Sequence, residues 1–468
     1  MPGFFSNLLE SLQGRRKDMR FLCNRLLSER GEASQTVIAQ EIISAYSAMK
    51  PEQRPEFFQF LSREYSADPA KVHAAAVEYE RAPGSDTLAA LSQAVEAPRQ
   101  ELIRRINTAP QGTETLVTLR GHLLSLPRNG ASRNGAPSTN GSHYEALDSD
   151  LRHLFRSWFN RGFLRMERIS WQTSARILEK LIRYESVHEI NGWPDLRRRL
   201  EADRRCFAFF HPALDDEPII FVEVALAKGL AGDLEPLLDV NAPVLDPAKA
   251  DTAIFYSINN CLVGLRNVPF GNFLIKQVVT ELAAEFPNIR NYSTLSPLPL
   301  FSSALHDNDN PDGFTRDRLA RLLAEYSREL GAHGGRRDVV DVLFKLLEDP
   351  RAHRKILAAP LERLALAYLT RARRNGKLYD PVATFHLSNG ARLERINVFG
   401  NLRPYGLEAS YGVTVNYRYL PDELEENHER FVRGGQIRVP SVLYSDHKAV
   451  AAAWDPPPVE KSTREKRR

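Results

Sequence analysis

Residues 254–299 read IFYSINNCLVGLRNVPFGNFLIKQVVTELAAEFPNIRNYSTLSPLP and carry the most informative pattern in the chain. The apolar, β-branched run Ile254–Ile258 predicts a buried strand, and a turn that includes Arg266 and Gly271 follows it. Apolar residues then recur at helical spacing until Pro287 stops the helix, and a second strand leads into a Ser-Pro step. The stretch therefore predicts a strand–loop–helix–strand unit.

A helix that begins directly after a turn presents unpaired backbone N–H groups and the positive end of its dipole. Phosphate is the usual occupant of such a site, so the loop between the first strand and the helix is a candidate phosphate-binding segment. The residues expected to contribute are Arg266, Asn267, Val268, Pro269, Phe270, Gly271 and Asn272.

Length and composition indicate a globular protein of more than one domain. The chain has 468 residues, more than one hydrophobic core usually serves. Apolar residues make up 43% and charged residues 26%, which is ordinary for a globular chain. The net charge of +4 is too even to favour a nucleic-acid partner.

Cysteine spacing and hydropathy bear on the compartment. Cys23, Cys206 and Cys261 are far apart and form no CxxC pair, which argues against a disulfide framework or a zinc site. No apolar run is long enough for a transmembrane helix, so no membrane partner is expected. The first residues lack the apolar core of a secretion signal, and the chain ends in EKRR rather than SKL. These features predict a cytoplasmic protein.

The pattern changes along the chain from helical to mixed. Residues 1–188 predict an all-α helical bundle that contains a Gly/Asn/Ser/Pro-rich mobile loop at 127–142. Residues 189–455 predict an α/β domain with a helical insertion at about 313–374. Residues 456–468 are rich in proline and charge and predict a disordered tail. The expected fold class is therefore a multidomain α+β protein.

Strands are expected where apolar, β-branched runs lie between turn residues. In particular, Ser388-Asn389-Gly390 between two such runs predicts a β-hairpin. The strands expected besides the unit described above are Cys206–Phe210, Ile219–Ala225, Val382–Leu387, Ala391–Val398 and Tyr411–Leu420. Glu223 lies within one of these runs and is expected to face solvent or to cap a turn.

Three long motifs occur in a fixed order and resemble the malonyl-CoA decarboxylase family. They are FYSI with the loop and helix up to LSPLP, then DPVATFHLSNGARLERIN at Asp380–Asn397, and NYRY at Asn416–Tyr419. The resemblance covers roughly residues 171–444. It implies that the second domain is GNAT-like and that its loop binds the pyrophosphate of CoA. Here Pro269 stands where the GNAT loop has its middle glycine, which removes one backbone donor.

The resemblance implies the conversion of malonyl-CoA to acetyl-CoA and CO2, a reaction of fatty acid metabolism. In such a reaction the C–C bond breaks and its electrons enter the thioester carbonyl, so the substrate is its own electron sink. No metal and no organic cofactor are therefore expected. The resemblance also implies a homotetramer assembled through the helical domain.

The same resemblance assigns three catalytic residues. His386 is expected to protonate the enolate, and Ser296 is expected to orient the carboxylate or relay a proton. Tyr419 is expected to support their hydrogen bonds. Pattern alone leaves alternatives open, because His386 could be a buried strand histidine and Ser296 a Ser-Pro loop marker. Ser293 and Thr294 are further hydroxyls that could take the serine's role.

The densest positive cluster in the folded part is Arg197–Arg199 together with Arg204 and Arg205. A solvated helix face is the ordinary explanation, and the CoA 3′-phosphate or an acidic surface of a neighbouring subunit are the alternatives. Two other functions remain open for the whole chain. One is acyl transfer from CoA to an amine by a GNAT-type acyltransferase, and the other is a non-catalytic acyl-CoA-binding protein.

Overall fold

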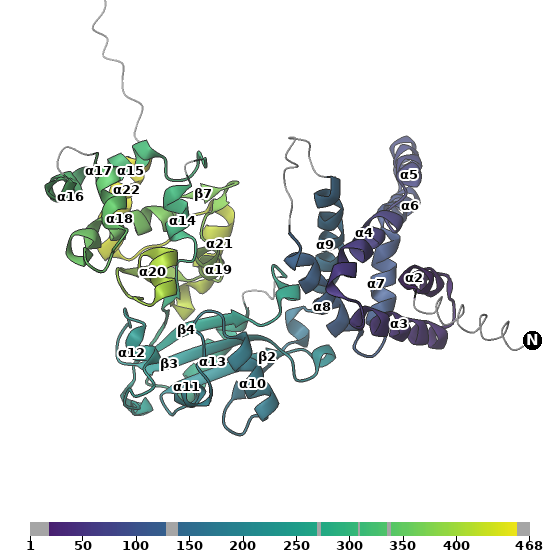
Figure 1. The fold of residues 1–468 in the computed structure, drawn as a ribbon, viewed down its shortest axis with the longest axis horizontal. Helices are drawn as coiled ribbons and strands as arrows, with labels where there is room; N and C mark the ends of the chain where they lie inside the picture. Colours follow the sequence, from purple (N-terminus) through teal and green to yellow (C-terminus); the bar gives the residue numbers. More distant parts are fainter. Residues whose placement is uncertain (1–17, 128–138, 269–272, 308, 335–337, 456–468) are drawn as a thin grey trace, which may run out of the picture.

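The computed structural model describes residues 18–127, 139–268, 273–307, 309–334 and 338–455. Three groups of elements follow one another along the chain (Figure 1). Helices α2–α9 lie at one end, a mixed sheet with helices α10–α13 lies next, and helices α14–α22 lie at the other end. The prediction of a helical region followed by a mixed α/β region is confirmed, whereas its GNAT-like character stays a prediction.

The first region is helical because capping residues and prolines divide amphipathic runs. Asp18 and Asp68 accept backbone N–H bonds at the starts of α2 and α5, and Pro98 opens α7. Part of the expected mobile loop 127–142 lies outside the described residues, but residues 139–142 belong to α9. The helices are α2 Met19–Ser28, α3 Glu32–Ser47, α4 Arg54–Glu64, α5 Pro69–Arg81, α6 Ser85–Val95, α7 Pro98–Asn107, α8 Gly112–Ser125 and α9 Thr139–Trp158.

The main sheet has eight strands in the order β1-β2-β3-β4-β5-β10-β6, with β9 on the other side of β10. Of the pairs recorded among the described residues, only β4 and β5 run parallel, and helix α13 (Phe273–Glu285) makes the crossover between them. The expected strand–loop–helix–strand unit is therefore confirmed. The strands are β1 Arg165–Ile169, β2 Arg204–Phe210, β3 Pro218–Ala227, β4 Thr252–Asn260, β5 Asn291–Thr294, β6 Ser296–Pro297, β9 Arg392–Asn397 and β10 Thr414–Tyr419.

Both faces of the sheet are buried, which explains the continuous apolar runs of β2–β4. Alternate residues such as Phe207 and Phe255 face one core, and Cys206 and Ile254 face smaller clusters on the opposite side. The second face packs against α10 (Ala175–Tyr184), α11 (Trp193–Arg199) and α12 (Glu235–Leu238). Strand β1 also joins the sheet. The sheet region therefore begins at Arg165, although the sequence predicted only helices up to residue 188.

The C-terminal helices surround the last strands and include the expected insertion. A short two-stranded ribbon, β7 (Arg373–Arg374) with β8 (Lys377–Leu378), follows the longest of them. The helices are α14 Phe301–His306, α15 Arg316–Leu323, α16 Ser327–Gly334, α17 Val339–Leu346, α18 Arg354–Thr370, α19 Pro381–Ser388, α20 Pro404–Ser410, α21 Leu424–Gly434 and α22 Tyr444–Trp454. The tail 456–468 lies outside the described residues.

The hairpin predicted around Ser388-Asn389-Gly390 is wrong, because the first of its strands is helix α19. The Asp380 side chain caps the helix by accepting the N–H of Ala383 at 2.6 Å, and a proline occupies its first position. At the other end the N–H of Gly390 donates to Leu387 and that of Ala391 to His386, which is a Schellman motif with Gly390 at φ 81°. The Asn-Gly pair therefore ends a helix instead of turning a hairpin.

The interpretation of the arginine cluster as a solvated helix face is also wrong. Arg198 and Arg199 are buried, and their guanidinium groups pair with Asp203 and with Asp195 and Glu223. Glu223 was expected to face solvent, but it is only 1% exposed, and burial raises its pKa to about 7. These charges form an internal network between α11 and β3, where each compensates its neighbour in a medium of low dielectric constant.

Among the residues that the structure describes, no helix combines the length and the hydropathy that crossing a bilayer requires.

Candidate active site

Ser296 lies where strand β10 changes partner from β5 to β6. Arg418 pairs with Ser293 and Val415 pairs with Ser296, so both short strands follow one register along β10. The chain from β5 to β6 is thus a single strand with an interruption, and Ser296 is the first residue after it.

Side chains replace the missing ladder bonds at this interruption. The N–H of Tyr417 donates to the Thr294 hydroxyl at 3.0 Å, and the Asn416 side-chain amide donates to the Thr294 carbonyl at 2.6 Å. The Thr294 and Ser296 side chains lie on the same face, because they are two residues apart in an extended chain, and their hydroxyl oxygens are 2.9 Å apart. The interruption therefore holds two hydroxyls side by side, and side chains pair the Thr294 carbonyl and the Tyr417 N–H there.

The three predicted catalytic side chains meet in one hydrogen-bonded chain. His386 Nε2 is 3.1 Å from Ser296 Oγ although the residues are 90 positions apart in sequence. His386 Nδ1 is 2.7 Å from the hydroxyl of Tyr419 on β10. Helix α19 thus presents the imidazole to the strand interruption from one side, and β10 supplies the tyrosine from the other.

The contacts fit a single direction of donation along the hydrogen-bonded chain. The Ser296 hydroxyl is placed to donate to Thr294 Oγ1. In the imidazole tautomer with its hydrogen on Nε2, His386 donates to Ser296 Oγ. A neutral imidazole has one donor and one acceptor nitrogen, so in this tautomer Nδ1 accepts from the Tyr419 hydroxyl. With this tautomer, donation runs from Tyr419 through His386 and Ser296 to Thr294.

Burial determines the charge of the hydrogen-bonded side chains of His386, Ser296 and Tyr419. His386 is 3% exposed, Ser296 5% and Tyr419 1%. Desolvation lowers the pKa of His386 from 6.5 to about 3 and raises that of Tyr419 well above its usual range. Burial therefore keeps the imidazole of His386 neutral in the free protein.

Tyr417 is a site residue that sequence reasoning missed. Its ring stacks on the His386 imidazole at a centroid distance of 4.7 Å and an interplanar angle of 24°. It is buried, and it fixes the plane of the imidazole that Tyr419 and Ser296 contact at the two nitrogens. The period of two within NYRY was the available signal, because it puts Tyr417 and Tyr419 on one face of the strand.

The candidate phosphate-binding segment is described only in part. Arg266 and Asn267 are exposed, and Asn267 has φ 63°, a left-handed conformation that asparagine tolerates. The N–H groups of Arg266 and Val268 already donate to Val263 and Leu265, and the Val268 side chain is buried. The other expected contributors, Pro269, Phe270, Gly271 and Asn272, lie outside the described residues.

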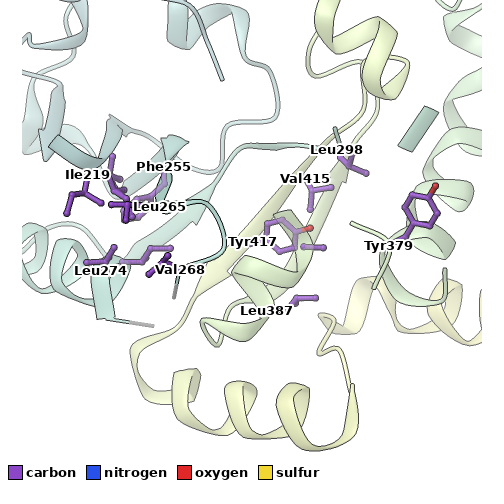
Figure 2. Close-up of a cluster of buried hydrophobic side chains, with 14 of the residues drawn as sticks. Ile219, Phe255, Leu265, Val268, Leu274, Leu298, Tyr379, Leu387, Val415 and Tyr417 are labelled. Carbon is purple, nitrogen blue, oxygen red and sulfur yellow. The ribbon is translucent and has the colours of Figure 1, made fainter. Parts of the chain in front are cut away.

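The bend, defined as residues 263–268, shares a hydrophobic cluster with the site. Figure 2 shows Leu265 and Val268 gathered with Phe255 of β4, while Tyr417 of β10 lies further along the same cluster. The ring of Phe255 is 6.2 Å from that of Tyr419. The core thus connects the bend mechanically to the hydrogen-bonded chain.

Within the described part of the chain, no group of three or more His, Cys, Asp or Glu side chains could hold a metal ion.

Comparison with protein families identifies what this arrangement belongs to. The family model of the malonyl-CoA decarboxylase N-terminal domain matches residues 65–159, and the family model of the malonyl-CoA decarboxylase C-terminal domain matches residues 162–455. The second match alone spans more than half of the chain and includes the sheet, the bend and the hydrogen-bonded chain. The chain belongs to the malonyl-CoA decarboxylase family, a family of carboxy-lyases.

Individual relatives agree with this assignment. The chain is 33% identical over 425 residues to the mitochondrial malonyl-CoA decarboxylase of Anser anser anser, covering 84% of this chain and 79% of the relative. It is 30% identical over 422 residues to that of Mus musculus, covering 86% and 84%.

Solved structures of similar proteins show the same fold. The malonyl-CoA decarboxylase of Rhodopseudomonas palustris is 41% identical with a TM-score of 0.78, covering 92% of this chain and 98% of that one. The malonyl-CoA decarboxylase of Agrobacterium vitis is 39% identical with a TM-score of 0.77, covering 94% and 100%.

Proposed function

We propose that this protein is a malonyl-CoA decarboxylase that converts malonyl-CoA to acetyl-CoA and CO2. The observation that carries the proposal is the 3.1 Å contact between Ser296 Oγ and His386 Nε2, made in a chain that belongs to this family. The proposed site consists of His386, Ser296 and Tyr419, with the CoA pyrophosphate at Arg266–Asn272. Malonyl-CoA and acetyl-CoA are the expected ligands.

The proposed reaction begins with cleavage of the C–C bond to the carboxylate. Its electron pair moves into the thioester carbonyl, CO2 leaves, and an enolate remains. A thioester supplies this electron sink itself, so the proposal includes no metal and no organic cofactor. The Ser296 hydroxyl orients the carboxylate before cleavage by turning its single hydrogen from Thr294 Oγ1 to a carboxylate oxygen.

Protonation of the enolate completes the reaction. The α-carbon of a thioester enolate is a much stronger base than imidazole, so a neutral His386 can donate its Nε2 proton, directly or through Ser296. His386 Nδ1 then takes the hydroxyl proton of Tyr419, 2.7 Å away, and water restores that proton after CO2 has left. The contacts of the two imidazole nitrogens with Ser296 at 3.1 Å and with Tyr419 at 2.7 Å support this order.

The direct test uses purified protein and malonyl-CoA labelled in the malonyl group. We expect acetyl-CoA and CO2 in equal amounts, with no acceptor amine and with chelator present. Release of CoA thiol only when an amine is added would favour the acyltransferase instead. Tight binding of malonyl-CoA without any turnover would favour the non-catalytic acyl-CoA-binding protein.

The neutral state of His386 predicts the pH dependence of kcat/KM, which reports the ionisations of the free enzyme and substrate. A histidine whose pKa is lowered from 6.5 to about 3 stays neutral throughout the neutral range. We therefore expect no inflection from His386 between about pH 5.5 and 7.5. Initial rates at low substrate concentration measure kcat/KM at each pH, within the pH range in which incubated enzyme keeps its activity. An inflection near pH 6.5 would contradict the neutral relay.

Assembly and location are part of the same proposal. We propose a homotetramer formed through the helical region and a cytoplasmic protein that serves fatty acid metabolism, with no nucleic-acid or membrane partner. The resemblance supports the assembly. Exposed apolar side chains on the first helices, Phe21 at 42% and Val37 at 59%, are compatible with a helical interface.

A further inference from the structure

Helix α8 of the helical region packs directly against the backbone of the bend. A Cβ atom on Gly264 would lie 1.8 Å from the carbonyl oxygen of Val117, so no other residue fits there without moving the backbone. On the facing side, a Cβ atom on Gly121 would lie 3.5 Å from the Gly264 nitrogen, in ordinary contact. Gly264 therefore lets the helix backbone and the bend approach closely.

Arg120 fixes this contact with a buried guanidinium group. Its Nη1 donates to the Gly264 carbonyl at 2.6 Å and to the Arg266 carbonyl at 2.9 Å. Its Nε donates to Asp148 of α9 at 2.7 Å, which compensates the charge. The side chain of Arg120 is 1% exposed, so these bonds form away from competing water.

Of the two carbonyls that Arg120 holds, that of Arg266 belongs to the first residue of the candidate phosphate-binding segment, and that of Gly264 lies two residues before it. Backbone bonds within the bend, from Arg266 to Val263 and from Val268 to Leu265, make it a compact turn. A shift of Gly264 therefore moves Arg266 and Asn267 together. The helical region determines where these exposed residues lie.

We propose that Arg120 is a positioning residue for substrate binding, through which the helical region sets the affinity of the bend for the CoA part of malonyl-CoA. This inference rests on the proposed function, which gives the bend to CoA. Arg120 does not touch the hydrogen-bonded chain at Ser296 and His386. Its removal therefore raises KM and leaves the chemical step intact.

Arg120→Lys tests the inference, because lysine keeps the charge near Asp148 but lacks the planar group whose Nε holds Asp148 while its Nη1 holds both carbonyls. We expect KM for malonyl-CoA and the Kd of CoA, measured by calorimetry, each to rise about tenfold, with kcat within about twofold of wild type. If this variant does not fold by circular dichroism, Asp148→Asn is the second variant, with about a threefold rise in both constants.

Arg99→Lys is the matched control. Arg99 is 8% exposed, its Nε donates to Asp150 at 2.5 Å and its Nη1 donates to the Ser62 carbonyl at 3.2 Å, all within the helical region. We expect it to lower Tm as Arg120→Lys does but to leave KM and the Kd of CoA unchanged.

The outcomes separate this inference from the proposed function. Equal KM and Kd in wild type and Arg120→Lys, with a lowered Tm, would overturn the inference alone. So would an equal rise in KM and Kd in the Arg99→Lys control. A wild-type protein that neither binds CoA nor consumes malonyl-CoA would instead overturn the proposed function.

Discussion

Replacing His386 by Asn is expected to lower kcat for malonyl-CoA by about 10²–10⁴-fold. Asparagine can still donate one hydrogen bond, but it cannot pass a proton from Tyr419 to Ser296, which lie on opposite sides of the imidazole at 2.7 and 3.1 Å. Ser296→Ala is expected to lower kcat by about 10²–10³-fold, because it removes the group that orients the carboxylate. Acetyl-CoA formation under saturating substrate measures both losses.

Ser293→Ala is the control that these variants need. Ser293 is also a buried strand serine, three residues before Ser296, but its hydroxyl donates to the carbonyls of Thr294 and Tyr417 and does not contact His386. We expect its kcat to stay within about threefold of wild type. A loss as large as that of Ser296→Ala would show that the hydroxyl of Ser296 has no special role. Full activity of both Ser296→Ala and His386→Asn would end the proposed mechanism.

The sequence predicted the sheet well, because its strands carry a signal that tertiary structure did not alter. The runs Cys206–Phe210, Ile219–Ala225 and Ile254–Ile258 are apolar on both faces, and the structure buries both faces. Helix α13 also follows from local spacing, since its apolar residues and the proline after it need no distant partner.

Helix α19 shows where a local signal is ambiguous. Asn-Gly serves both a hairpin turn and a helix end, since both require a residue with positive φ. The deciding signal lay nine positions earlier, where Asp380-Pro381 is a helix start of the kind that caps and proline together define. The alternation of residues in VATFHL predicted a strand, but the segment is a helix. Its histidine, His386, still contacts Ser296 at the strand interruption.

Charged positions were predicted least well, because their environment depends on partners far along the chain. Glu223 appears as a polar residue in an apolar run, yet Arg199 from α11 pairs with it inside the protein. Arg120 carried no signal at all, since its carbonyl partners lie 144 and 146 positions away. Likewise, the meeting of Ser296 with His386 was expected from the resemblance and not from any pattern in the residues.

Replacing Gly390 by Ala is expected to destabilise the protein by about 3–5 kcal/mol. A Cβ atom at this position would lie 2.1 Å from the carbonyl oxygen of Leu424, and the backbone has φ 81°. The resulting shift would displace the end of helix α19, where His386 accepts a Schellman bond through its carbonyl. Urea unfolding measures the loss of stability, and kcat should fall as well because misplacement by about 1 Å can cost about 10²-fold.

Gly435→Ala separates the two causes of that loss, which are the clash with the Leu424 carbonyl and the strain of a left-handed backbone. Gly435 ends helix α21 at φ 62°, but nothing lies within 4 Å of the position that its Cβ would take. We expect Gly435→Ala to cost only the strain of the left-handed backbone, about 1 kcal/mol, and to leave kcat unchanged. If both variants lose the same stability, the contact with Leu424 contributes nothing, and the position of His386 does not depend on how tightly α19 ends against α21.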